Sequence, residues 1–131
     1  MAQDFPHHTP TTIRAPFANY CHGIEVPPDA RLMICSGQLG IDLADKIPIG
    51  SEAQTDLIFE NIAAVLASAD MDLTNLVRIN AYVSSREHLP GYMKARDRYV
   101  STPPPASTLM LVSGFAREEV VVEVEVIAAK I

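Results

Sequence analysis

The chain has 131 residues, of which 48% are hydrophobic and 20% are charged. This length corresponds to one domain, and this composition excludes a disordered or fibrous chain. Ten Lys and Arg against sixteen Asp and Glu give a net charge of −6, which makes a nucleic-acid partner unlikely because phosphate binding depends on clustered cations. The cysteines, Cys21 and Cys35, allow one disulfide at most, so the chain is not a disulfide scaffold.

The N-terminal part is predicted to be an arm over residues 1–16, because it is rich in Pro and His and shows no periodicity. Residues 17–131 are predicted to form a single domain. His7 and His8 lack a closed ligand set, so neither a metal nor a cofactor is expected. Since the start of the chain resembles no signal peptide and no apolar run approaches the ~20 residues of a membrane span, we expect a soluble, cytoplasmic protein with no membrane partner.

The first part of the domain is predicted to form a β-hairpin. Its strands cover residues 20–26 and 31–36, and the turn lies at 27–30, where Pro27 and Pro28 favour a bend. Gly37 and Gly40 then interrupt the second strand, where they permit a close approach of the backbone to another group. A further short strand is expected near Ile47.

Two helices are predicted after this hairpin. The first covers residues 51–69, where Ser51 and Gln54 form a capping-box pattern and apolar residues recur at helical spacing. The second begins at residue 86 or 88, carries Pro90 in its first turn and continues to residue 100.

Three further strands are predicted at residues 76–83, 106–112 and 120–129. The element order β-β-α-β-α-β-β indicates an α+β fold with a mixed sheet and two helices on one face. In the last strand Glu123 and Glu125 share a face with Val121 and Ile127. This face is too apolar to remain exposed, so we expect a homo-oligomer.

The two carboxylates of the last strand have two interpretations. If the face becomes an interface, desolvation and mutual repulsion raise the pKa of at least one of Glu123 and Glu125 toward the range useful for proton transfer. Alternatively, both carboxylates pair with Lys or Arg of a neighbouring subunit or stay solvated, and the pattern alone favours this second interpretation.

Four motifs between residues 13 and 131 carry a family resemblance: Asn19-Tyr20-Cys21-His22-Gly23, Ile34-Cys35-Ser36-Gly37-Gln38-Leu39-Gly40, Pro105-Ala106-Ser107-Thr108 and Val122-Glu123-Val124-Glu125-Val126. In order and spacing they resemble the Rid (RidA/YjgF) family, whose members are also labelled L-PSP endoribonucleases. The resemblance implies a chorismate-mutase-like fold and a homotrimer, with small-molecule sites in the clefts between subunits.

The activity implied by the resemblance is hydrolysis of small enamines and imines to carbonyl compounds and ammonia. In this reaction water attacks the imine carbon, and a carboxylate positions or deprotonates that water. By its place in the motif, Glu123 resembles this catalytic carboxylate. Tyr20 resembles the aromatic wall of the cleft, and Ser36 and Gly37 resemble the backbone against which the ligand packs.

Ser107 departs from the family pattern, because active deaminases carry there an arginine that binds the substrate carboxylate. A serine hydroxyl cannot replace a bidentate guanidinium, which argues against 2-aminoacrylate as the substrate. Arg14 and Arg78 are the candidate replacements. Three functions therefore stay open: a deaminase of another enamine or imine, a non-catalytic trimer that binds or senses a small molecule, and an endoribonuclease.

Overall fold

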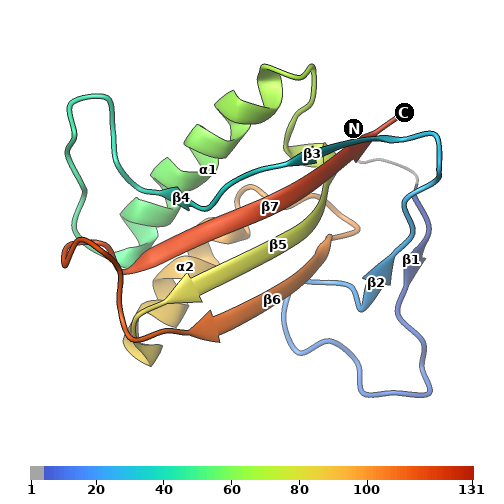
Figure 1. Ribbon diagram of the computed structural model, residues 1–131. Coiled ribbons are helices and arrows are strands. Elements are labelled where there is room, and N and C mark those ends of the chain that lie inside the picture. Colours follow the sequence, from blue (N-terminus) through green and yellow to red (C-terminus); the bar gives the residue numbers. More distant parts are fainter. Residues whose placement is uncertain (1–4) are drawn as a thin grey trace.

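The computed structural model describes residues 5–131 (Figure 1), so residues 1–4 of the predicted arm lie outside the described range. Within that range a five-stranded sheet has the order β3-β7-β5-β6, and β4 pairs with β7 beyond the end of β3. The β5–β6 pair is parallel and the other pairs are antiparallel. The elements of this layer structure are β3 (Arg31–Ile34), β4 (Gln38–Leu39), α1 (Ser51–Ala67), β5 (Leu76–Val83), α2 (Leu89–Arg96), β6 (Ala106–Leu111) and β7 (Val122–Lys130).

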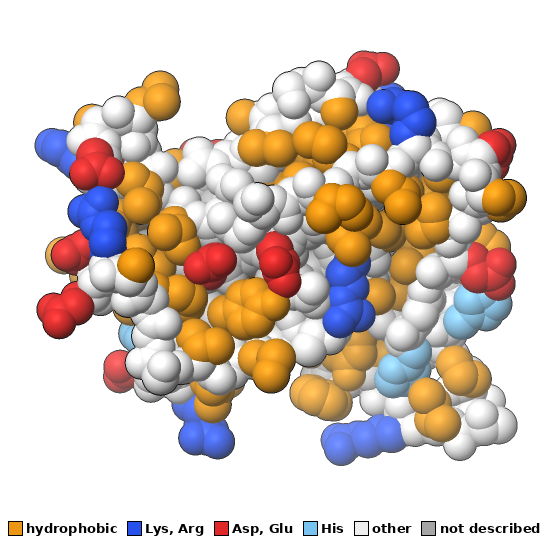
Figure 2. All heavy atoms as spheres, viewed as in Figure 1, with side chains coloured by type: hydrophobic (Ala, Val, Ile, Leu, Met, Phe, Trp, Pro, Cys, Tyr) orange, Lys and Arg blue, Asp and Glu red, His pale blue; other side chains and the backbone are white. Residues whose placement is uncertain are grey.

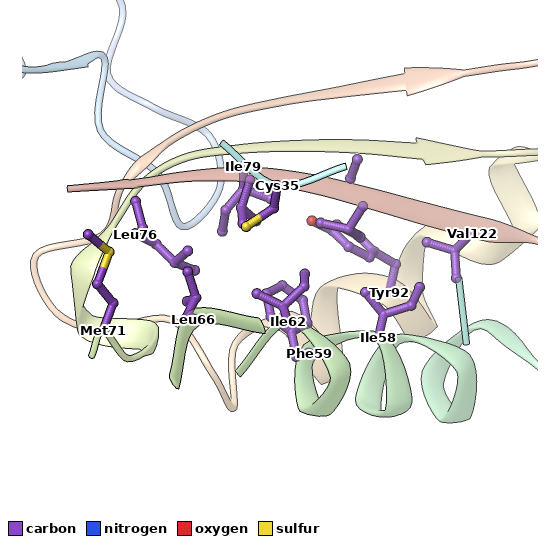
Figure 3. Close-up of a cluster of buried hydrophobic side chains, with 14 of the residues drawn as sticks. Cys35, Ile58, Phe59, Ile62, Leu66, Met71, Leu76, Ile79, Tyr92 and Val122 are labelled. Carbon is purple, nitrogen blue, oxygen red and sulfur yellow. The ribbon is translucent and has the colours of Figure 1, made fainter. Parts of the chain in front are cut away.

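Both helices lie on the same face of the sheet, which confirms the predicted α+β fold (Figure 1). The core lies between α1 and the sheet (Figure 3), and the apolar residues Ile58, Ile62 and Leu66, which recur at helical spacing along α1, are fully buried there. Phe59 is buried with them. The predicted alternation of β7 is also confirmed, because Val122, Val124, Val126 and Ala128 all face this core.

The predicted capping box at the start of α1 is wrong. Gly50 is the N-cap residue, with φ of 96°, and no side chain caps the helix. Gln54 instead lies 1% exposed and bridges three backbone groups outside the helix. Its Nε2 donates to the carbonyls of Pro48 (2.9 Å) and Glu119 (2.8 Å), and its Oε1 accepts from the Val121 amide (3.0 Å). These buried backbone groups need hydrogen-bond partners. The Gln54 side chain therefore bonds to them and not to the backbone amides at the start of the helix.

The second helix is shorter than predicted. A 3₁₀ turn, η2 (Arg86–His88), precedes α2, and α2 ends at Arg96 instead of residue 100. After α2 the amides of Arg98 and Tyr99 donate to carbonyls three residues back, which tightens the chain into a turn.

The predicted hairpin of residues 20–26 and 31–36 is wrong. β2 (Gly23–Ile24) pairs with β1 (His7–His8), while β3 pairs with β7. All four residues of β3 pair with the end of β7, from Arg31 with Lys130 to Ile34 with Ile127, so the chain diverges after the turn at Pro27. The β1–β2 sheet also orders part of the predicted arm, and Phe5 packs in a small cluster with Val77 and Ala129.

The short strand expected near Ile47 is not formed. Asp42 organises this stretch as a turn: its Oδ1 accepts from the amides of Ala44 (2.8 Å) and Lys46 (2.9 Å), and its own amide donates to the Lys46 carbonyl. Local side-chain hydrogen bonds of this kind compete with strand pairing. The additional short strand at this edge of the sheet is β4, which pairs with β7.

The sheet face that carries no helix, here called the open face, is turned toward the viewer in Figure 2, where apolar side chains surround a few acidic and basic ones. Ile34 is 68% exposed and Met110 is 55% exposed, both on strands of this sheet. Cys21 and Cys35 are free and buried. Within residues 5–131, α1 and α2 both fall short of the length and hydropathy required to cross a membrane.

Candidate functional site

On the open face, the side chain of Glu123 lies against Gly37, in the irregular segment that connects β3 to β4. Glu123 and Leu39 are register partners, and Gly37 lies just before β4. A β-carbon at Gly37 would lie 2.9 Å from Cδ of Glu123 and closer still to its Oε2. The motif glycine thus permits the carboxylate of Glu123 to lie in this position, which a β-carbon at residue 37 would deny it. Ser36, which precedes Gly37, is exposed, and its carbonyl accepts from the Gln38 side chain (3.3 Å).

The two carboxylates of β7 differ in their surroundings. Glu125 accepts a 2.6 Å hydrogen bond from the Tyr82 hydroxyl and a longer one, 3.4 Å, from Asn80 Nδ2. Within residues 5–131 no hydrogen-bond donor reaches the carboxylate of Glu123. Glu123 is therefore free for a ligand or a water molecule, whereas Glu125 is held in place by its neighbours.

The electrostatics of the two glutamates follow from this difference. Partial burial, with a smaller contribution from the charge of Glu125, raises the pKa of Glu123 above its ordinary value. The pKa of Tyr82 is also raised, first because its hydroxyl donates to Glu125. A carboxylate with a raised pKa and no committed partner is suited to accept a proton from water.

A second feature, here called the edge pocket, lies between β6, α2 and the segment before β2. It is a cavity of about 370 Å³. Tyr20 and Ser107 supply hydroxyl groups, and Leu89, Met93 and Phe17 supply apolar surface. The Tyr20 ring is held edge-on between Phe17 (centroids 5.9 Å apart) and His22 (6.0 Å). Concave, mostly apolar surroundings with a few polar groups are typical of small-molecule sites.

Arg96 also lines the edge pocket, although only 4% of its surface is exposed. Its Nε and Nη2 both donate to Oδ1 of Asp97, at 3.2 and 3.0 Å. The sequence analysis did not identify Arg96. The sequence feature that could have identified Arg96 is its helical spacing from Leu89 and Met93, which places an arginine on the apolar face of α2.

The predicted site residues fall into two groups that one chain does not bring together. Glu123, Ser36 and Gly37 belong to the open face, while Tyr20 and Ser107 line the edge pocket. Ser107 is the register partner of the core residue Ile79, so it faces the helix layer, and β5 separates it from β7.

The two candidate replacements for the family arginine lie outside the edge pocket. Arg14 is exposed, with its guanidinium carbon 5.4 Å from the ring centroid of Phe17, which lines the pocket. Arg78 points to the open face, where it donates to Asn80 (2.8 Å) and Thr108 (2.7 Å). In the described part of the chain, no three His, Cys, Asp or Glu side chains are grouped so that they could hold a metal ion.

Comparison with known proteins gives the same family as the motifs. The family model described as Endoribonuclease L-PSP matches residues 11–130. Among characterised sequences, the chain is 29% identical over 100 residues to the protein DfrA of Myxococcus xanthus, covering 75% of this chain and 76% of that one. It is also 30% identical over 77 residues to the mitochondrial protein mmf2 of Schizosaccharomyces pombe, a match that spans 59% of this chain and 61% of that protein.

Solved structures share the fold. The Rid-family protein YyfB of Yersinia pestis superposes with a TM-score of 0.82 at 22% identity, covering 98% of this chain and 100% of that one. RidA of an Antarctic Psychrobacter species superposes with a TM-score of 0.72 at 26% identity, covering 88% and 92%. The family match over nearly the whole chain and the common fold agree with the motifs around Gly37 and Glu123, and the chain therefore belongs to the Rid/YjgF family, also called the L-PSP endoribonuclease family.

Proposed function

We propose that this protein hydrolyses small enamines or imines to carbonyl compounds and ammonia. The observation that carries the proposal is the carboxylate of Glu123, which has a raised pKa, no hydrogen-bond donor among the described residues, and the bare backbone of Gly37 beside it. That combination places on the open face a base to which no described residue donates a hydrogen bond, so it is free to exchange a proton with a water molecule or a ligand.

The proposed chemistry requires only proton transfers and water. An enamine first tautomerises to its imine. Glu123 then accepts a proton from water as the water oxygen bonds to the carbon of the imine, which carries a proton on its nitrogen, and a neutral carbinolamine forms. Glu123 returns this proton to the carbinolamine nitrogen, and ammonia then leaves with the electron pair of the C–N bond while the hydroxyl proton is released to water. The carbonyl oxygen of the product comes from water, and the carboxylate returns to its starting state. The surroundings of Glu125, which is bonded to Tyr82, suit it to a supporting electrostatic role.

The proposed active unit is a homotrimer in the cytoplasm. Exposed Ile34 and Met110 on an open face with acidic residues support self-association, because such a surface is costly to leave in water. The separation of Glu123 from Tyr20 and Ser107 within one chain supports a cleft shared by two subunits, with Glu123 from one and the edge pocket from the other. Ser107 in place of arginine makes 2-aminoacrylate a poor candidate substrate.

A second candidate function is binding of a small molecule without turnover. Ser107 favours it, since the family's charged substrate anchor is absent from that position while the edge pocket remains. An endoribonuclease, the activity in the family's description, is the third candidate, and the net charge of −6 weighs against it.

The test is an assay of ammonia and carbonyl product over a panel of freshly generated enamines and imines with and without a carboxylate group, including 2-aminoacrylate. We expect turnover that Glu123→Gln abolishes and Glu60→Gln, on the exposed face of α1, leaves intact. Full activity of Glu123→Gln would overturn the mechanism. Saturable ligand binding without turnover of any imine would favour the binding protein, and cleavage of labelled RNA would favour the third candidate.

A further inference from the structure

We propose that Arg96 is the anion anchor of the edge pocket, and that the pocket takes a small carboxylate with an apolar substituent. The inference rests on the proposed function in taking this pocket as part of the ligand site. It assigns to Arg96 the charge that Ser107 lacks, and it names the class of molecule that the pocket selects.

The first argument is the burial of a permanent charge. Arg96 is 4% exposed, and a guanidinium does not deprotonate in proteins. Its one acidic partner, among the residues described, is Asp97, whose side chain is 51% exposed. The same Oδ1 of Asp97 also accepts from Asn19 Nδ2 (3.3 Å). One shared oxygen at the surface compensates the buried guanidinium only in part, which leaves it able to gain from a second anion.

The second argument is the geometry of the guanidinium. Asp97 binds Nε and Nη2, which form the side-on edge of the group. Within residues 5–131 Nη1 makes no hydrogen bond, and the buried Tyr92 hydroxyl, which also makes none, interacts electrostatically with Arg96. The end-on edge is therefore not committed to a carboxylate of the chain. The ring of Tyr92, fully buried and with its centroid 5.7 Å from Cζ, supports the group from another side. A planar guanidinium held in this way matches a carboxylate through two parallel hydrogen bonds.

The third argument concerns the rest of the ligand. Leu89 and Met93 lie on the same face of α2 as Arg96, and Phe17 adds a third apolar wall. Tyr20 and Ser107 add neutral hydroxyls beside them. A cavity of about 370 Å³ with this lining suits a short branched or thioether side chain attached to an acidic group. Arg14 is exposed and does not line the cavity, and solvent and salt weaken its attraction for an anion.

The experiment measures binding at the pocket without any turnover. The protein is labelled at its methionine methyl groups, and the Met93 signal is assigned with Met93→Leu. The probes are 4-methylpentanoate and 4-methylpentanamide, which share a shape and differ in charge. The acid should shift the Met93 signal saturably and bind at least about tenfold more tightly than the amide. Equal affinity of the two probes for the unaltered protein, or displacement of the acid by equimolar inorganic phosphate, would overturn the proposal.

Variants then assign the preference to one residue. Arg96→Gln should remove the difference between acid and amide, whereas Arg14→Gln should retain it; the opposite pattern would name Arg14 as the anchor and overturn the assignment. Arg96→Lys keeps a charge beside Asp97 but loses the planar fork, so it should weaken acid binding and leave amide binding unchanged. This variant decides the matter if Arg96→Gln does not fold, because undiminished acid binding by Arg96→Lys would contradict the proposal.

Ser107→Arg in the Arg96→Gln background supplies a rescue, since residue 107 lines the same cavity. The acid preference should return in this double variant, and its failure to return in a folded protein would count against a common anion position. The binding experiment and the turnover assay test different proposals. Glu123-dependent turnover without an acid preference would overturn the Arg96 assignment alone, whereas acid binding at Met93 without turnover would overturn the enzyme proposal alone.

Discussion

The α-carbon of Gly37 faces the carboxylate of Glu123 so closely that a methyl group at residue 37 would displace that carboxylate. Gly37 lies between β3 and β4, at the edge of the sheet, while Glu123 lies in the adjacent strand β7. The backbone of Gly37, between the two edge strands, therefore allows the carboxylate of Glu123, the proposed base, to take its present position.

Gly37→Ala should impair catalysis far more than folding. The atoms that the new methyl group meets belong to the end of a flexible side chain, so Glu123 can swing away while the strands stay paired. We expect turnover to fall by about a hundredfold, as for a catalytic group misplaced by about 1 Å. The matched control is Gly23→Ala, because a β-carbon at Gly23 meets nothing within 4 Å. Steady-state rates and urea unfolding of both variants check this; equal activity of both would contradict it.

Glu123→Gln should stabilise the protein at neutral pH. The pKa of Glu123 is raised in the folded state, so the folded protein holds this proton more tightly than the unfolded chain. The resulting penalty appears as pH rises from the unfolded pKa through the folded one, and it is absent at lower pH. Urea unfolding should show the variant more stable than the parent at pH 7, with the difference gone near pH 3.5. A variant less stable than the parent at pH 7 would mean that Glu123 is not desolvated.

Gln54→Ala should cost at least about 2 kcal/mol of unfolding free energy, because it leaves three backbone groups around the helix start without their side-chain partner. The control is Ser51→Ala. Ser51 is the other residue of the predicted capping box, and its side chain does not cap α1. The change at Ser51 removes one hydroxyl that makes no capping hydrogen bond, so it should cost less unfolding free energy than the change at Gln54. Similar losses for both variants in chemical denaturation would indicate that the N-terminal turn of α1, and not the Gln54 bridge, sets the stability.

Ile34→Glu should dissociate the proposed trimer. Ile34 is 68% exposed on β3 and is the register partner of Ile127, so the substitution places a charge on the apolar part of the open face. Ala64→Glu adds the same charge to an exposed position of α1, on the opposite layer, and should leave the mass unchanged. Light scattering at micromolar concentration distinguishes the two. A parent protein that is already monomeric would refute the assembly.

The elements most completely predicted from sequence are those whose pattern is repeated over many residues. β5 matches its predicted range, and β7 shows the expected alternation between core and open face. Both strands lie in the middle of the sheet, where burial of one face enforces a period of two. The hairpin failed because turn residues such as Pro27 and Pro28 define a bend but not the partner of each strand.

The same distinction holds for the candidate site. The motif identified Gly37, Glu123, Tyr20 and Ser107, but it did not show that the first two lie on the open face and the others in the edge pocket. The resemblance assigned the catalytic role to Glu123, but the strand pattern gave no physical reason to distinguish Glu123 from Glu125. The hydrogen bond from Tyr82 makes the difference, and it depends on the register of β5 against β7.

The sequence by itself determined the family, the α+β class, the positions of the central strands and the residue types at the motif positions, because these depend on local order and periodicity. Tertiary structure alone decided which carboxylate is free, why residue 37 is glycine, and that Arg96 enters the pocket beside Ser107. The physical reason is that these features arise from contacts between segments distant in the chain, whose partners are selected by packing and by the need to satisfy buried polar groups.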